Sequence, residues 1–160
     1  ALPISALGAT ASAGSSADAA RADHVHARST YGDLGPINDS IMFIISDRGE
    51  TATISGNYVE TLPLTFAGTV TRITVGTHPS NTGTSSTSLN AYKRSSGTKT
   101  SLVASDVTMA SGVSSATATL SGVSGALAFA VGDRLGVDLN AVGTGASGIQ
   151  LLIDYTRSAS

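Results

Sequence analysis

Two histidines, His24 and His26, are the residues of this sequence whose type and spacing best suit chemistry. In an extended backbone, side chains at positions i and i+2 point to the same side, so one chain presents both imidazoles in one direction. Two imidazoles make a poor metal site, whereas three chains around a threefold axis offer six, which suits an octahedral first-row ion such as Fe²⁺ or Ni²⁺. Asp23 is placed to accept a ring N–H and so set the tautomer. In the alternative interpretation both histidines are solvated or pack against neighbours, and Asp23 caps a turn.

The rest of the sequence offers little that could carry catalysis. His78 lies beside a proline in a loop, and no Gly-x-Ser-x-Gly elbow precedes a helix. Gly97–Thr100 resembles the end of a phosphate-binding loop but lacks the upstream glycine and the following helix, so we expect a hairpin tip. Asp47–Glu50 places two carboxylates near an arginine, as a glycosidase or cation site would, but a charged turn explains it better. We therefore predict that the protein is not an enzyme.

Composition excludes several classes of protein. The 160 residues suffice for one ordinary domain and a tail. Charged residues make up 12% and the net charge is −2, which provides neither a nucleic-acid footprint nor a basic membrane patch. Aromatic residues make up 4%, with no Trp, so there is little material for a stacking platform, and the absence of Cys excludes thiolate sites. No apolar run approaches the roughly 18–20 residues that span a bilayer, so we expect no membrane insertion.

Residues 1–37 differ in kind from the residues that follow. Small residues dominate the stretch, and alone it cannot bury enough apolar surface to offset the entropy of ordering. Two glycines and a proline in Thr30–Pro36 are typical of a turn-rich linker. We expect an extended arm that another surface orders. The first six residues lack the basic and long apolar segments of an export signal, so we expect synthesis in the cytoplasm.

The pattern of residues 38–160 predicts a series of short strands. Gly-, Ser- and Thr-rich spacers separate apolar segments that alternate with period two, and no amphipathic helix lies between them. The expected strands lie at 41–45, 69–75, 88–93, 115–120, 135–139 and 149–155. Ile41–Ile45 is continuously apolar, which predicts a strand buried on both faces. The pattern predicts an all-β fold, an antiparallel β-sandwich or jelly-roll-like domain after the N-terminal arm.

The supply of large apolar residues is small for a domain of this length. Roughly 120 residues with few aromatics make a thin core, and the alternation places Leu152 on the outer face of its strand. Thin sandwiches with apolar residues on outer faces often complete their burial by oligomerising.

The N-terminal segment resembles a motif of tail-fibre, head-fibre and other appendage proteins of tailed bacteriophages. The likeness is carried by Leu7–Gly14, a small-residue stretch, followed by Ala19–His26, which reads Ala-Ala-Arg-Ala-Asp-His-Val-His. In this sequence Ala27 stands where the motif commonly has a proline, which puts the local turn in doubt. The resemblance implies a parallel trimer in which His24 and His26 ligate an iron, or another first-row divalent metal ion, shared by three chains.

The remainder resembles a phage β-sandwich module that often follows such a motif. The similar stretches are Ile41–Ile45, Leu62–Thr71 and Val131–Leu139, and the likeness rests on the order of the elements. Together the two resemblances cover most of the chain.

These observations predict a structural virion protein, a trimeric fibre- or spike-like appendage that docks by its arm and projects the sandwich. The expected partners are further copies of the chain, other virion proteins of the tail, baseplate, portal or capsid, and a host-surface glycan or protein. Receptor contacts are expected on loops such as Asn81–Ser86. One alternative is a capsid decoration or head-fibre protein. An alternative of another class is the carbohydrate-binding module of a secreted enzyme, which should show a row of exposed Trp or Tyr and an export signal.

Overall fold

A computed structural model describes residues 37–46, 58–77 and 85–158. The chain divides into two units, Ala1–Leu34 and Gly35–Ser160, and all described residues belong to the second. Within the described residues there are ten strands and no helix, and hence no helix long and apolar enough to cross a membrane. The prediction of an all-β fold is confirmed.

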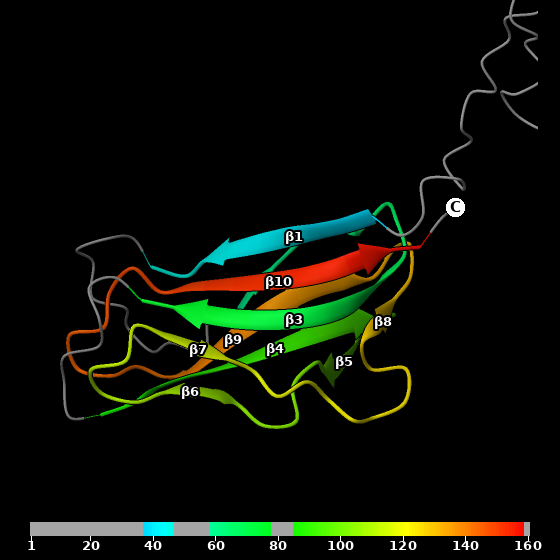
Figure 1. The fold of residues 1–160 in the computed structure, drawn as a ribbon. Coiled ribbons are helices and arrows are strands. Elements are labelled where there is room, and N and C mark those ends of the chain that lie inside the picture. The colour runs from blue at the N-terminus through cyan, green and yellow to red at the C-terminus, as the bar shows by residue number, and fades with distance from the viewer. Residues whose placement is uncertain (1–36, 47–57, 78–84, 159–160) are drawn as a thin grey trace, which may run out of the picture. The chain divides into compact units, whose positions relative to one another are not determined.

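The strands form two antiparallel sheets that pack face to face as a sandwich (Figure 1). Sheet I has the order β1-β10-β3-β7, with β8 also paired to β3, and sheet II has the order β2-β9-β4-β5, with β6 also paired to β4. The strands of sheet I are β1 (Ile37–Ile44), β10 (Gln150–Arg157), β3 (Gly68–Gly76), β7 (Ser115–Thr117) and β8 (Ala128–Phe129). The strands of sheet II are β2 (Tyr58–Glu60), β9 (Arg134–Ala141), β4 (Thr87–Ser95), β5 (Thr98–Ser101) and β6 (Val107–Met109).

The core lies between the sheets and is built by the period-two alternation that the sequence shows. Each long central strand sends alternate side chains inward, because successive residues of a strand point to opposite faces. The fully buried inward residues include Ile73, Val75, Leu151 and Ile153 from sheet I and Leu89, Ala91, Leu135 and Met109 from sheet II. The period-two alternation that the sequence shows is therefore confirmed in these central strands.

The first strand differs from the prediction. Ile41–Ile45 was expected to be buried on both faces, but among the described residues β1 is an edge strand whose one partner is β10. Phe43 enters the core, whereas Met42 and Ile44 point outward and are 56% and 53% exposed. A run of apolar residues alone does not distinguish a central strand from an edge strand whose outer face is also apolar.

The outer face of sheet II buries an aromatic side chain that periodicity places outside the core. Tyr92 follows the inward-pointing Ala91, so its side chain lies on the outer face, yet it is only 1% exposed. Its ring lies across Gly136, the residue paired with it on β9, and its hydroxyl donates to Glu60 at 2.8 Å. The Lys99 ammonium lies 3.9 Å from the ring centroid on the solvent side. Glycine is required at position 136 because the ring occupies the space of a side chain.

Replacing Gly136 by alanine is expected to destabilise the domain by about 1–3 kcal/mol, the usual cost of overpacking a well-packed site. The added Cβ would lie 2.5 Å from Cζ of Tyr92 and 2.9 Å from Cγ of Glu60, so both side chains must move. Urea unfolding followed by circular dichroism measures the change. Gly122→Ala is the matched control, since its Cβ would meet nothing within 4 Å. Equal stability of the two variants would contradict this account of Tyr92.

Candidate functional site

The residues predicted to bind metal lie outside the described part of the chain. These residues are His24 and His26. His78, Asp47–Glu50 and all but the last two residues of the loop Asn81–Ser86 also lie outside the described part. The metal role of the two histidines therefore stays a prediction. Among the described residues, no group of three or more His, Cys, Asp and Glu side chains is placed to hold a metal ion.

The segment Gly97–Thr100 belongs to a hairpin, as the sequence predicts: Gly97 lies in its turn and Thr98–Thr100 begin strand β5. Strands β4 and β5 are joined by Ser96 and Gly97, whose φ angles of 47° and 87° are both positive. Two positive φ angles in a two-residue loop match the right-handed twist of the paired strands. The backbone of this segment turns a hairpin, and the following residues continue as a strand.

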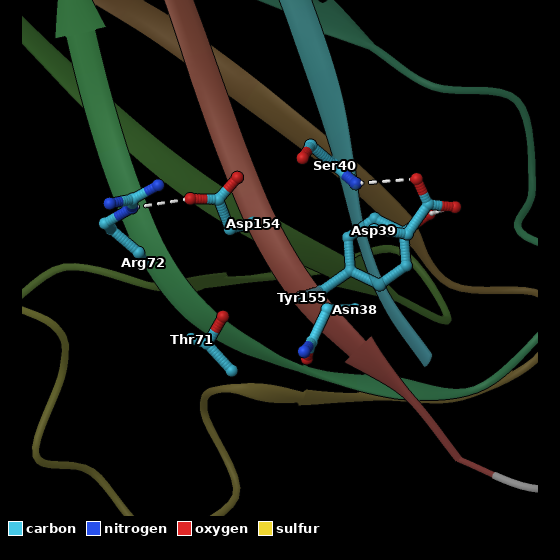
Figure 2. A pocket seen from close by; sticks show the side chains of 7 residues that line it. All are labelled: Asn38, Asp39, Ser40, Thr71, Arg72, Asp154 and Tyr155. Atoms are coloured by element: carbon cyan, nitrogen blue, oxygen red, sulfur yellow. Dashed lines mark hydrogen bonds and ion pairs between the residues drawn. The ribbon is translucent and has the colours of Figure 1, made fainter. Parts of the chain in front are cut away.

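The described surface is hollowed on the outer face of sheet I, near the start of β1 (Figure 2). The pocket has a volume of about 430 Å³. Three strands contribute its lining: Asn38, Asp39 and Ser40 from β1, Thr71 and Arg72 from β3, and Asp154 and Tyr155 from β10. It is thus a polar surface pocket made by strands that are far apart in the sequence.

A β-bulge creates this pocket. The register between β3 and β10 shifts between Asp154 and Tyr155, so that Thr71 has no partner on β10. The extra residue turns two consecutive side chains, Thr71 and Arg72, toward solvent, while Val70 and Ile73 on either side stay buried. Bulges commonly re-aim side chains in this way at functional surfaces.

The charged groups of the pocket satisfy one another. Arg72 Nε donates to Asp154 at 2.6 Å, although the arginine side chain is 64% exposed, so the pair contributes little to stability. Asp39 accepts from the backbone N–H of Ser40 at 2.8 Å and from the Tyr155 hydroxyl at 3.1 Å. These two bonds hold the pKa of Asp39 below its ordinary value, while burial and the bond to Asp39 raise the pKa of the Tyr155 phenol.

The pocket presents several hydrogen-bonding groups to solvent. Asn38, Ser40 and Thr71 supply amide and hydroxyl groups around the Arg72–Asp154 pair. Groups of this kind match the hydroxyls of a sugar or the backbone of another protein chain.

The same face becomes apolar toward the far end of β1. Met42 and Ile44 are exposed there, and Leu152 of β10, the partner of Met42 in the register, is half-buried between them and β3. The predicted outward position of Leu152 is confirmed. We call Met42, Ile44 and Leu152 the apolar patch of sheet I.

The outer face of sheet II has the opposite character. Glu60 accepts from Arg94 Nε at 2.6 Å and from Tyr92, and the Lys99 ammonium lies 2.6 Å from Asp138. Burial alone would raise the pKa of Glu60, but these hydrogen bonds outweigh it and lower the pKa. Nearby, a second network centres on Asp106, which accepts from Asn140 at 2.7 Å, from Asn90 at 3.0 Å and from Ser88 at 3.1 Å. This face is a charged surface whose groups pair with one another.

Comparison of the chain with protein-family models, with curated proteins and with solved structures finds no match.

The pocket was not predicted from the sequence, although the sequence contains one signal for it. Within β3, the buried residues Val70 and Ile73 are three positions apart, whereas the alternation of a regular strand requires an even spacing. This odd spacing marks the bulge. The contributions of Asn38 and Asp154 carry no such signal, because they depend on strand order.

Removing the Tyr155 hydroxyl is expected to raise the pKa of Asp39 only part of the way to the ordinary 3.8, since the larger contribution, from the Ser40 N–H, remains. A folded pKa below the unfolded value stabilises the domain above about pH 4 and loses that stabilisation as the pH falls. The acid sensitivity of Tyr155→Phe should therefore be weaker than that of the parent. Carboxyl ¹³C titration measures the pKa, with Tyr92→Phe as the control that leaves Asp39 unchanged. An unaltered Asp39 pKa in Tyr155→Phe would contradict this assignment.

Proposed function

We propose that the protein is a structural virion component of a tailed phage, a trimeric fibre- or spike-like appendage that docks by its N-terminal arm and projects the sandwich. The observation that carries this proposal is the pairing of Ile37 with Arg157. It places the start of β1 and the end of β10 at one end of the sandwich (Figure 1). A chain that enters and leaves at one end is suited to tethering there and to presenting the other end.

The loops at the opposite end support this orientation. The segments after β1, β3, β6 and β9 leave the sheets there, as the pairing of Ile44 with Gln150 and of Gln150 with Gly76 requires. Parts of these loops are fixed to one another. The backbone N–H of Thr144 donates to Ser85 Oγ at 3.0 Å, and that of Gly143 donates to Thr87 Oγ1 at 2.9 Å.

A fixed rim of Gly, Ser and Thr residues offers backbone and hydroxyl groups to a host-surface glycan or protein, and ordered loops lose less entropy when they bind. Ser85 and Ser86, the described part of the predicted receptor loop, belong to this rim. Receptor binding at this end is part of the proposal.

The aromatic side chains favour this reading over a carbohydrate-binding module. Phe43, Tyr92, Phe129 and Tyr155 are buried, and Phe66 is half-buried in the core. None of these five rings is available for the exposed row on which such modules stack sugars. A capsid decoration or head-fibre protein would share the architecture, and it differs only in where the chain lies on the particle.

The full-length chain is expected to have the mass of three copies in solution, because the arm brings three chains together. Sedimentation equilibrium or native mass spectrometry measures this mass. A monomer would overturn the trimeric appendage. Labelling of intact particles with antibody against the sandwich distinguishes a tail or baseplate position from a capsid position, and no labelling of virions would contradict the proposal altogether.

The trimer is expected to carry about one first-row metal ion per three chains, because six imidazoles fill an octahedral site. Elemental analysis of the purified protein measures the ion. The double variant His24→Ala/His26→Ala should lose it, whereas His78→Ala, the control at the third histidine of the chain, should retain it. Metal content that is unchanged in the double variant would exclude these ligands.

A further inference from the structure

The edges of the two sheets are unequal. The described strands at or beside the other edges are short: β2, β6 and β7 have three residues each, β5 has four and β8 has two. The edge strand β1 has eight residues, all of them paired with β10 on one side. Short edge strands are one of the means by which proteins avoid edge-to-edge association, and a long apolar edge is a site of association unless it is covered.

The side chains on this edge have the character of an interface core. Met42 and Ile44 are more than half exposed and, with Leu152, form the apolar patch of sheet I. Among the described strand residues, Arg72 and Asp154 on the outer face of this sheet pair with each other, and Asp39, which lines the pocket near the other end of β1, accepts from the Ser40 N–H and the Tyr155 hydroxyl. Depletion of unpaired charge around an apolar centre distinguishes interfaces from ordinary surface.

We infer that the apolar patch of sheet I, along β1, is a contact between copies of this chain. This inference rests on the trimer proposed above. The second copy is the occupant that the chain's connectivity favours. The arm directly precedes β1 in the sequence, so arms that associate tether the sandwiches of all copies to one another. Tethering of this kind raises the local concentration of one patch near another.

The symmetry of the proposed trimer limits the geometry of such a contact. Copies related by a threefold axis cannot place two β1 edges antiparallel to one another, so the contact is made by the side chains of Met42, Ile44 and Leu152 rather than by an antiparallel pairing of main chains. The charged outer face of sheet II then stays in solvent. A two-fold arrangement would instead pair two β1 edges in opposite directions.

Cross-linking of single cysteines tests this contact directly, because the chain has no natural Cys. Full-length Ile44→Cys is oxidised with copper phenanthroline, and its products are separated by denaturing electrophoresis. Val123→Cys is the control, since Val123 is an exposed apolar residue, 67% exposed against 53% for Ile44, that lies outside sheet I. If mere exposure governed collision, the control would cross-link faster.

The expected result is cross-linking at Ile44→Cys at least about tenfold faster than at Val123→Cys, as a high effective concentration dictates. On a threefold axis it should stop when two of three chains are joined, because the third thiol has no partner. A second variant, Met42→Glu/Ile44→Glu, should lower the midpoint temperature at which the oligomer dissociates, and Val123→Glu should not.

The outcomes separate this inference from the proposed function. A monomeric parent overturns the trimer and the contact together. A trimeric parent with equal cross-linking rates in both cysteine variants overturns the contact alone, and leaves the patch to another virion protein. Complete conversion to cross-linked pairs supports the contact between copies but replaces the threefold axis by a two-fold axis.

Discussion

The pairing of β1 with β10 is the constraint on which the rest of the domain depends. It joins the first and last described strands through eight consecutive residue pairs, from Ile37 with Arg157 to Ile44 with Gln150. Closing so long a stretch of chain costs entropy that only the burial of the whole core offsets. The same pairing places the start of β1 and the end of β10 at one end of the sandwich. A slip by one residue would turn Met42 inward and Phe43 outward, so the core itself holds the register.

A small group of aromatic rings stabilises the end at which the chain enters and leaves. Phe66 stacks on Tyr155 with ring centroids 5.4 Å apart, and Phe129 meets both rings edge-on. The Arg157 guanidinium covers Phe66 at 3.9 Å. Gly68 is required here, because a Cβ at that position would lie 2.6 Å from the Phe129 ring and from a backbone oxygen. Three of the seven aromatic residues of the chain are thus gathered where β1, β3 and β10 must stay aligned.

The class of fold and the identity of most core residues could be predicted from the sequence, because period-two alternation records which face of a strand is buried. Leu135, Val137 and Leu139 show this directly. The edge position of β1 could not be predicted, since it depends on strand order, which alternation does not encode. For the same reason Tyr92 reads as an outward residue, although cross-strand neighbours bury it completely.

The pocket shows the same limit at the level of a site. Arg72 and Asp154 face each other only because β3 and β10 are neighbours in sheet I. From the sequence alone, Asp154 is expected to be an ordinary residue on the polar face of its strand. What the sequence did contain was the odd spacing of Val70 and Ile73, a local consequence of the bulge. The metal-binding hypothesis for His24 and His26 concerns residues outside the described structure and stays a prediction.

The two outer faces differ in what it costs to cover them, and this difference gives the sandwich a direction. On sheet II, Glu60, Arg94, Lys99 and Asp138 are paired with one another but remain partly hydrated, so a partner that covered them would have to desolvate several charges at once. On sheet I the apolar patch gains by leaving water, and little charge stands in its way. On the described surface, covering sheet I is therefore less costly than covering sheet II.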